Sequence, residues 1–287
     1  MPALYVVATP IGNLEDISQR ALRTLRQVTL IAAEDTRQTK KLLTTYDIRT
    51  PTTSYHQHNK WAKLDYILNR LEEGDVALVC NAGTPGISDP GYELIVAASQ
   101  RGIPVVPIPG ASAVTTALAI SGLPTDRFTY IGFLPNKANA RRRALESVAG
   151  ETGTIIALES PHRLPAALND VLLTLGDRRI AVCRELTKLH EEVFRGTVSR
   201  ALKHFTEPRG EFTLVIEGRG AKDKPQLTEA VEEQLHQIYL SGATAKEAIA
   251  IVAGETGLSR KELYQVWLRF DKVWDRGDSC PNLERRK

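Results

Sequence analysis

Four short runs of apolar and β-branched residues recur in the first half of the chain, and each is followed by a segment with helical spacing. The runs begin at residues 4, 28, 75 and 103 and read LYVVATP, VTLIAAED, DVALVCNAG and IPVVPIPG. This alternation is typical of βαβ units, in which helices cover a mostly parallel sheet. We therefore predict an α/β fold with a first domain over residues 1–124.

A second series of strand-like runs begins after residue 125. These runs are FTYIGFLP, TIIALES, IAVCREL and FTLVIEG, and they predict a second α/β domain over residues 125–219. The polar, Gly- and Pro-containing segment 218–226 then indicates a linker into a helical extension over 226–287. In that extension, KEAIAIVAGETGLSRKELYQVWLRF has two helical patterns around a Gly-containing turn, a spacing similar to a helix-turn-helix.

The composition is that of a globular protein with a mild basic excess. The 287 residues are 42% hydrophobic and 25% charged, and the formal net charge of +3 permits an anionic partner without requiring one. The cysteines have neither the close pairs of a zinc site nor the even count of a secreted disulfide framework; they are Cys80, Cys183 and Cys280. No apolar run is long enough for a membrane span or a signal sequence, so we expect a soluble, cytoplasmic protein.

Ligands of open α/β sheets bind at the carboxyl ends of the strands. Four small, polar or Gly-bearing loops reach that edge in the predicted first domain: TPIGNLED, EDTRQT, NAGTPGISDPG and PGASA. Neither GxxxxGKS/T nor GxGxxG occurs there, which disfavours a Walker nucleotide hydrolase and a Rossmann dehydrogenase. The Gly-rich loop after residue 80 can hold a ligand against its bare backbone, or it can be a plain turn.

Polar residues follow two of the predicted strands of the first domain. Asp35 either caps the next helix or acts as a base, and Arg37 either binds a phosphate or pairs with Glu34. We expect an extended segment at residues 56–59, which places His56 and His58 on the same side, a spacing that metals use. No third ligand is near them in the sequence, so we predict surface or substrate-contacting histidines and no metal site.

Three other groups of residues leave two interpretations open. Ser112 and Ala113 open a helix whose free amides can bind a carboxylate, or Ser112 simply caps that helix. Glu159 and Glu185 either face a cleft or cap helices. The basic residues of the extension either contact phosphates or form a solvated charged face; they are Lys246, Arg260, Lys261, Arg269 and Lys272.

Eight motifs together resemble a known family. They are TPIGNLEDISQRAL, LIAAEDTRQT, NAGTPGISDPG, PGASA, GFLP, LESPHR, RELTKLHEE and GEFTLVIEG. Their order and spacing are similar to those of the S-adenosylmethionine-dependent tetrapyrrole methylase superfamily. More narrowly, the chain resembles the ribosomal RNA small-subunit methyltransferase I group, which methylates the ribose 2′-oxygen of a cytidine in the decoding centre. The resemblance runs from about Leu4 to Gly218 and extends to the helical tail.

The resemblance implies a cofactor, S-adenosylmethionine, held in the cleft between the two α/β domains. Residues that match the family's cofactor contacts are Pro10, Gly83, Thr84, Ile87, Ser112, Ala113, Leu158, Leu186 and Thr213. Asn81 stands where many relatives have aspartate, which argues against a role for it as a base. The resemblance also implies a homodimer and a ribosomal RNA substrate, either free or in the assembled 30S subunit.

Methyl transfer to a ribose hydroxyl needs alignment of the reacting atoms and is helped by a base. We expect Asp35 or His56 to be that base. We expect RNA contacts from Glu34, Arg37, Lys246, Arg260 and Lys261. Two alternatives stay open: a methylase of corrinoid-type precursors, against which the basic tail argues, and a non-catalytic RNA-binding assembly protein.

Overall fold

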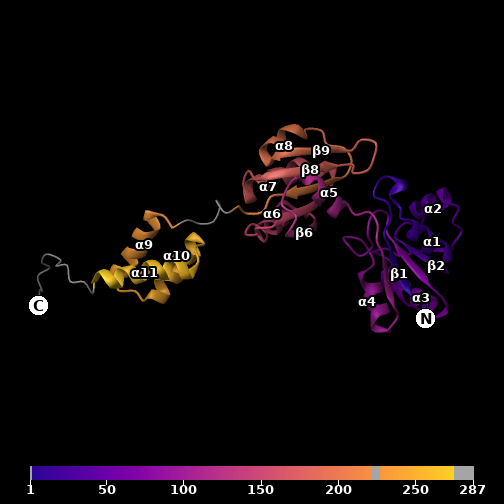
Figure 1. Cartoon of the computed structure of the whole chain (residues 1–287), viewed down its shortest axis with the longest axis horizontal. Helices are drawn as coiled ribbons and strands as arrows, with labels where there is room; N and C mark the ends of the chain where they lie inside the picture. The colour runs from indigo at the N-terminus through magenta and orange to yellow at the C-terminus, as the bar shows by residue number, and fades with distance from the viewer. Residues whose placement is uncertain (1, 221–226, 275–287) are drawn as a thin grey trace, which may run out of the picture. The chain divides into compact units, whose positions relative to one another are not determined.

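The computed structural model describes residues 2–220 and 227–274. The chain divides into two compact units, Met1–Gly218 and Arg219–Lys287 (Figure 1). The first unit contains two sheets, and the second contains helices.

The first sheet, predicted to be mostly parallel, is fully parallel. Its strand order is β3-β2-β4-β1-β5. The strands are β1 (Leu4–Val7), β2 (Leu30–Ala33), β3 (Thr52–Ser54), β4 (Val76–Val79) and β5 (Val105–Ile108). Strands β2 and β4 are buried along their whole length, which is why they read as continuous apolar runs. Strand β3 was not predicted, because three residues with two threonines carry no periodic signal.

Helices cover both faces of this sheet. They are η1 (Leu14–Asp16), α1 (Gln19–Gln27), α2 (Thr36–Thr45), α3 (Lys60–Glu73) and α4 (Tyr92–Gln100). Residues of α1 and α2 share one apolar core, and residues of α3 and α4 share another (Figure 1). The Ser18 hydroxyl caps α1 by accepting a hydrogen bond from the Ala21 amide at 3.1 Å.

The second sheet is mixed. Its order is β6-β7-β10-β8-β9; β6 and β7 are parallel, and the other neighbours are antiparallel. The strands are β6 (Phe128–Phe133), β7 (Thr154–Glu159), β8 (Arg179–Arg184), β9 (Glu192–Thr197) and β10 (Phe212–Ile216). Strand β9 was not predicted, since its residues are all partly exposed or exposed and form no apolar run.

The second sheet also has a core on each face. One core involves α6 (Ala138–Glu146), α7 (Leu164–Leu175) and α8 (Val198–His204), and the short η2 (Pro161–Arg163) precedes α7. The opposite face packs against α5 (Ala113–Ser121), which lies beside this sheet in Figure 1. Helix α5 therefore packs on the second sheet, although it precedes the predicted domain boundary at residue 124. Its start consequently lies close to both halves of the first unit, the half with the first sheet and the half with the second.

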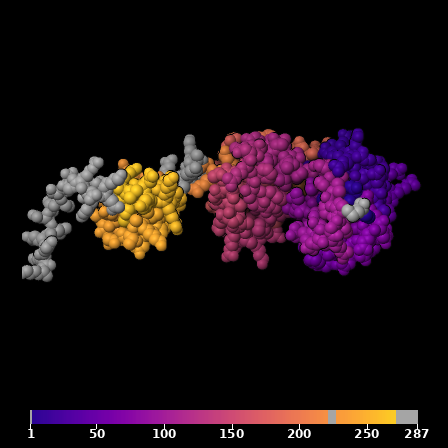
Figure 2. Space-filling model, turned by 60° about the horizontal axis from the view of Figure 1, so that its bottom comes forward, coloured from indigo at the N-terminus to yellow at the C-terminus, as the bar shows by residue number. Residues whose placement is uncertain are grey.

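The helical unit consists of α9 (Glu229–Leu240), α10 (Ala245–Thr256) and α11 (Arg260–Trp274), whose side chains close into a rounded body (Figure 2). The predicted turn is present: Gly257 ends α10 with φ +70°, and the Ser259 hydroxyl accepts from the Glu262 amide at 3.2 Å. Among the described residues, the helices are too short or too polar to cross a membrane.

Candidate functional site

A cavity of about 380 Å³ lies between the carboxyl ends of the first sheet and the second sheet, within the size range of ligand pockets. Its walls come from both halves of the first unit. The lining residues are Ile11, Glu34, Asn81, Ala82, Gly83, Thr84, Ile87, Ser88, Asp89, Ser112, Ala113, Val114, Tyr130, Phe133, Leu158, Glu159, Ser160, Pro161, Cys183, Leu186, Glu211, Phe212 and Thr213. Eight of the nine predicted cofactor residues are among them.

One wall of the cavity is the Gly-rich loop after β4. Gly83, Gly86 and Gly91 have φ values of +85°, +82° and +150°, a region that favours glycine. The backbones of Thr9 and Gly83 exchange two hydrogen bonds, which tie this loop to the end of β1. The loop is therefore an ordered wall of the cavity with little side-chain bulk.

A second wall is the start of α5. Ser112 occupies the N-cap position, but its side chain makes no capping hydrogen bond. The first amides of a helix have no partner within the helix, and they favour an anionic group. The start of α5 can therefore bind a carboxylate, while Ser112 occupies the N-cap position without a side-chain capping bond.

The third wall comes from the second sheet and is mainly apolar. Leu158 and Thr213 are paired across β7 and β10, and Leu186 follows β8. A loop over residues 185–191 carries Leu186, and its backbone is strained: Glu185 and Thr187 have φ values of +48° and +64°.

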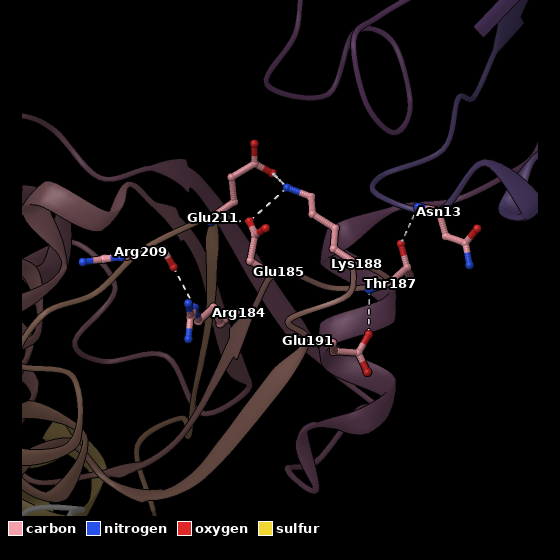
Figure 3. A network of polar contacts seen from close by, with 8 residues as sticks. All are labelled: Asn13, Arg184, Glu185, Thr187, Lys188, Glu191, Arg209 and Glu211. Carbon is pink, nitrogen blue, oxygen red and sulfur yellow. Dashed lines mark hydrogen bonds and ion pairs between the residues drawn. The ribbon is translucent and has the colours of Figure 1, made fainter. Parts of the chain in front are cut away.

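Polar contacts hold this loop in place (Figure 3). Lys188 Nζ bonds Glu185 Oε1 at 2.9 Å and Glu211 Oε2 at 3.1 Å. The Asn13 amide donates to Thr187 Oγ1 at 3.0 Å, which joins the loop to the segment after β1. Leu186 is therefore positioned by contacts with both halves of the unit.

Glu159 supplies an unused acceptor in the cavity wall. Its side chain is fully buried, and Oε1 accepts from Arg163 at 2.6 Å and from the Ser160 amide at 2.7 Å. Oε2 is buried without a hydrogen-bond partner among the described residues. Such an atom is costly unless a ligand or water donates to it. S-adenosylmethionine has amino and hydroxyl donors, a carboxylate and an apolar body, so the acceptor, the helix start and the apolar wall fit it.

The end of the cavity near β2 and β4 is acidic. Glu34 and Asp89 both line it, and Glu34 Oε2 accepts from the Asn81 amide at 3.0 Å. Burial, together with the negative charge of Glu34, raises the pKa of Asp89 to about 6. Tyr130 lies at the same end, and its hydroxyl is 2.6 Å from Ser88 Oγ.

The two predicted catalytic residues do not line this cavity. Asp35 caps α2, and its carboxylate accepts from Arg37 NH2 at 2.9 Å. This hydrogen bond holds the pKa of Asp35 at about 2. His56 lies in a turn after β3, where its amide donates to Asn59 Oδ1 at 2.7 Å. The turn replaces the extended segment that we expected around His56 and His58.

The remaining predicted contacts lie elsewhere. Pro10 lines a second cavity of about 280 Å³, which also contacts Asn81. Arg37 is 88% exposed. Lys246, Arg260 and Lys261 are exposed on the helical unit. The side chain of Lys272 and all of Cys280 lie outside the described residues.

Sequence reasoning missed several lining residues. Asp89 belongs to the same Gly-rich motif that pointed to the site, so its position in SDPG was an available signal. Tyr130, Phe133 and Phe212 gave no such signal, because they occur within strand-like runs that also form core. In the part of the chain that the structure describes, His, Cys, Asp and Glu residues form no group of three that could hold a metal.

Comparison with known proteins gives the same fold. The family described as Tetrapyrrole (Corrin/Porphyrin) Methylases matches residues 3–202. Among solved structures, a uroporphyrin-III-C-methyltransferase from Thermus thermophilus matches with a TM-score of 0.54 at 19% identity, covering 76% of this chain and 94% of that one. A diphthine synthase matches with a TM-score of 0.54 at 16% identity, covering 75% of this chain and 90% of that one.

Curated relatives are much closer in sequence. A protein of Halalkalibacterium halodurans is 50% identical over 92% of this chain and 94% of its own length. A protein of Synechocystis is 49% identical over 94% of this chain and 99% of its own length. A protein of Thermotoga maritima is 50% identical over 76% of this chain and 100% of its own length. All three are named Ribosomal RNA small subunit methyltransferase I. The chain therefore belongs to the tetrapyrrole methylase family and, within it, to the group of proteins that carry this name.

Proposed function

We propose that the protein transfers a methyl group from S-adenosylmethionine to the ribose 2′-oxygen of a cytidine in the decoding centre of small-subunit ribosomal RNA. The observation that carries this proposal is the cavity of about 380 Å³, which combines a bare backbone wall, an apolar wall and an acidic end. The relatives' shared name supports a ribosomal RNA acceptor.

Bound S-adenosylmethionine supplies an electrophilic methyl group on its sulfonium. The amides at the start of α5, with Ser112 and Ala113, suit its carboxylate, and Glu159 Oε2 suits one of its hydrogen-bond donors. Leu158 and Leu186 provide apolar contact. By fixing the donor in one orientation, these residues favour in-line attack by the acceptor oxygen.

RNA contacts are proposed for Glu34 at the cavity, for the exposed Arg37 at the start of α2, and for the basic residues Lys246, Arg260 and Lys261 of the helical unit. The Thermotoga maritima relative, matched over its whole length, covers 76% of this chain, and residues 1–218 make up the same share. This favours a methylase unit that is complete without the helical unit. We therefore assign the helical unit to RNA affinity.

A second candidate function is methylation of a corrinoid-type small molecule. The similarity to a uroporphyrin-III-C-methyltransferase favours it, but identity of 19% is evidence for the fold alone. The third interpretation, an RNA-binding assembly protein without catalysis, would keep the cofactor cavity without methyl transfer.

The deciding experiment supplies labelled S-adenosylmethionine together with unmodified small ribosomal subunits, with the free RNA, and with a tetrapyrrole precursor. The modified nucleotide is then mapped. Label on a cytidine ribose supports the proposal, and the better RNA substrate shows whether assembly forms the site. Label on the tetrapyrrole favours the second candidate, and cofactor binding without transfer to any acceptor favours the third.

Three smaller parts of the proposal need their own tests. A homodimer predicts a mass of twice 31.7 kDa in solution scattering. A cytoplasmic location predicts that the protein is recovered in the cytoplasmic fraction when cells are fractionated. If Asp35→Ala and His56→Ala both keep the wild-type single-turnover rate, neither residue is the base.

A further inference from the structure

The acidic end of the cavity places one carboxylate, that of Asp89, in an unusual setting. Asp89 is half-buried in the loop that leads into α4, between Ser88 and Pro90. Ser88 has φ +61°, a strained conformation for a residue with a side chain, and Gly91 follows with φ +150°, which glycine adopts readily. The short contact between Ser88 Oγ and the Tyr130 hydroxyl, 2.6 Å, fixes this loop to β6.

No cation balances the charge of Asp89 within the cavity. Among the residues that line it there is no Lys, Arg or His. The titratable groups that face Asp89 are Glu34 after β2, the Cys80 thiol after β4, and Tyr130 on β6. Burial and the charge of Glu34 raise the pKa of Asp89 to about 6, and the Cys80 thiol acts in the opposite direction.

We propose that Asp89 accepts the proton of the attacking ribose 2′-hydroxyl. This inference rests on the proposed function. Asp89 lines the cavity in which the cofactor and the acceptor must meet, whereas Asp35 lies outside that lining and is paired with Arg37. A base is most effective when its pKa lies near the working pH, and about 6 meets that condition better than about 2.

The proposed step is balanced. The hydroxyl oxygen forms a bond to the methyl carbon while its proton moves to the Asp89 carboxylate. The electron pair of the broken sulfur–carbon bond stays on sulfur, which becomes a neutral thioether. Asp89 then returns its proton to water.

The test is the single-turnover rate of methyl transfer to the RNA substrate between pH 5 and pH 8. In the wild type, the rate should rise to a plateau with an apparent pKa near 6, when Asp89 becomes ionised. Asp89→Asn should lower the plateau about 100-fold or more and remove this dependence. It should bind S-adenosylhomocysteine, measured by calorimetry, within about twofold of the wild type.

Glu34→Gln separates the proton-accepting role from a structural one. It removes a negative charge near Asp89 while the amide oxygen can still accept from the Asn81 amide. The apparent pKa of the rate profile should therefore move to lower pH. The matched control is Asp65→Asn, an exposed carboxylate on α3, which should leave the profile unchanged.

Several outcomes would overturn the inference. One is an Asp89→Asn rate within threefold of the wild type, with the rise near pH 6 retained. Another is an Asp89 carboxyl that titrates below pH 4.5 in carbon-13 NMR spectra of the wild type, a measurement that decides the matter even if Asp89→Asn does not fold. If the wild type methylates no RNA, the proposed function fails first, and the inference fails with it.

Discussion

Thr9 and Gly83, 74 residues apart in the sequence, exchange two backbone hydrogen bonds of 2.8 and 3.0 Å. The Thr9 hydroxyl also donates to the Cys80 carbonyl at 3.1 Å. These bonds join the end of β1 to the Gly-rich loop after β4, two neighbouring strands of the parallel sheet. The loop wall of the cavity is therefore ordered before any ligand binds.

Gly83→Ala should weaken cofactor binding. Gly83 has φ +85°, which costs a residue with a Cβ about 1–2 kcal/mol, although the added carbon itself would have ordinary contacts, the nearest at 3.6 Å. The loop should relax away from Thr9 and bind S-adenosylhomocysteine more weakly by about tenfold in calorimetry. Gly102→Ala is the matched control, because Gly102 has φ +70° with no neighbour within 4 Å and lies outside the cavity. Equal loss of affinity in both variants would contradict the prediction.

Gly12→Ala should disturb the loop that carries Leu186. A Cβ on Gly12 would lie 2.4 Å from Lys188 Cγ and 2.7 Å from the Leu186 carbonyl oxygen, so the backbone must move. We expect a lower melting temperature and weaker binding of S-adenosylhomocysteine. Gly150→Ala, with open space around the new Cβ, should change neither measurement. Normal affinity of Gly12→Ala would show that the loop position does not matter for binding.

Asp170→Asn should destabilise the second half of the first unit. Asp170 and Arg141 are 3% and 5% exposed and bond at 2.7 Å, and Arg142 also donates to Asp170 at 2.8 Å. Removing the carboxylate leaves Arg141 buried without its counter-charge, which costs about 3–5 kcal/mol. Urea unfolding at pH 7 measures the loss, with Asp65→Asn as an exposed control.

The same pair predicts a pH dependence. Burial alone would raise the pKa of Asp170, but hydrogen bonds from Arg142 and Arg141 outweigh it and hold the pKa below its usual range. A lowered pKa stabilises the folded state above the unfolded value of about 4, and that stability is lost as the pH falls through the folded value. The difference in free energy of unfolding between the wild type and Asp170→Asn should therefore become smaller in acid.

Asp89→Asn should make the protein more stable at neutral pH. Because the pKa of Asp89 is raised to about 6, its contribution to stability is present below about pH 4 and is lost as the pH rises through 6. At pH 7.5 the wild type holds a partly buried, ionised carboxylate that asparagine avoids, a difference of about 1 kcal/mol once solvent screening of this group is included. The variant should melt at a higher temperature at pH 7.5 and lose this advantage at pH 4.5. An equal increase in the melting temperature of Asp89→Asn at both pH values would argue against a raised pKa of Asp89.

Replacing Lys246, Arg260 and Lys261 together by glutamine should weaken RNA binding without changing cofactor binding. These residues are exposed on a unit whose apolar core is formed by α9, α10 and α11 themselves. If they contact phosphates, the slope of log affinity against log salt should fall by up to about three. Neutralising Lys40, Lys63 and Lys137 of the first unit controls for net charge. An unchanged slope would remove the helical unit from the RNA contacts.

Much of the fold could be predicted because its signals are local. The runs at β2 and β4 are apolar because both strands are fully buried, and those at β1 and β5 contribute residues to the same cores. The Ser18 hydroxyl caps α1, and Gly257 ends α10, as these residue types commonly do. Strands β3 and β9 could not be predicted in this way. Neither forms a periodic apolar run, so only their hydrogen bonds to β2 and β8 make them strands.

The sequence by itself determined the class of the first sheet, the Gly-rich loop, the motifs of the family and eight residues of the cofactor cavity. The tertiary structure decided which carboxylate lines the cavity and how the environment shifts its pKa. Asp35 and Asp89 are the same residue type at the same edge of the sheet, but Arg37 holds the pKa of one at about 2, while burial beside Glu34 raises that of the other to about 6. Sequence patterns encode local conformation, whereas a pKa depends on burial and on charges that only folding brings together.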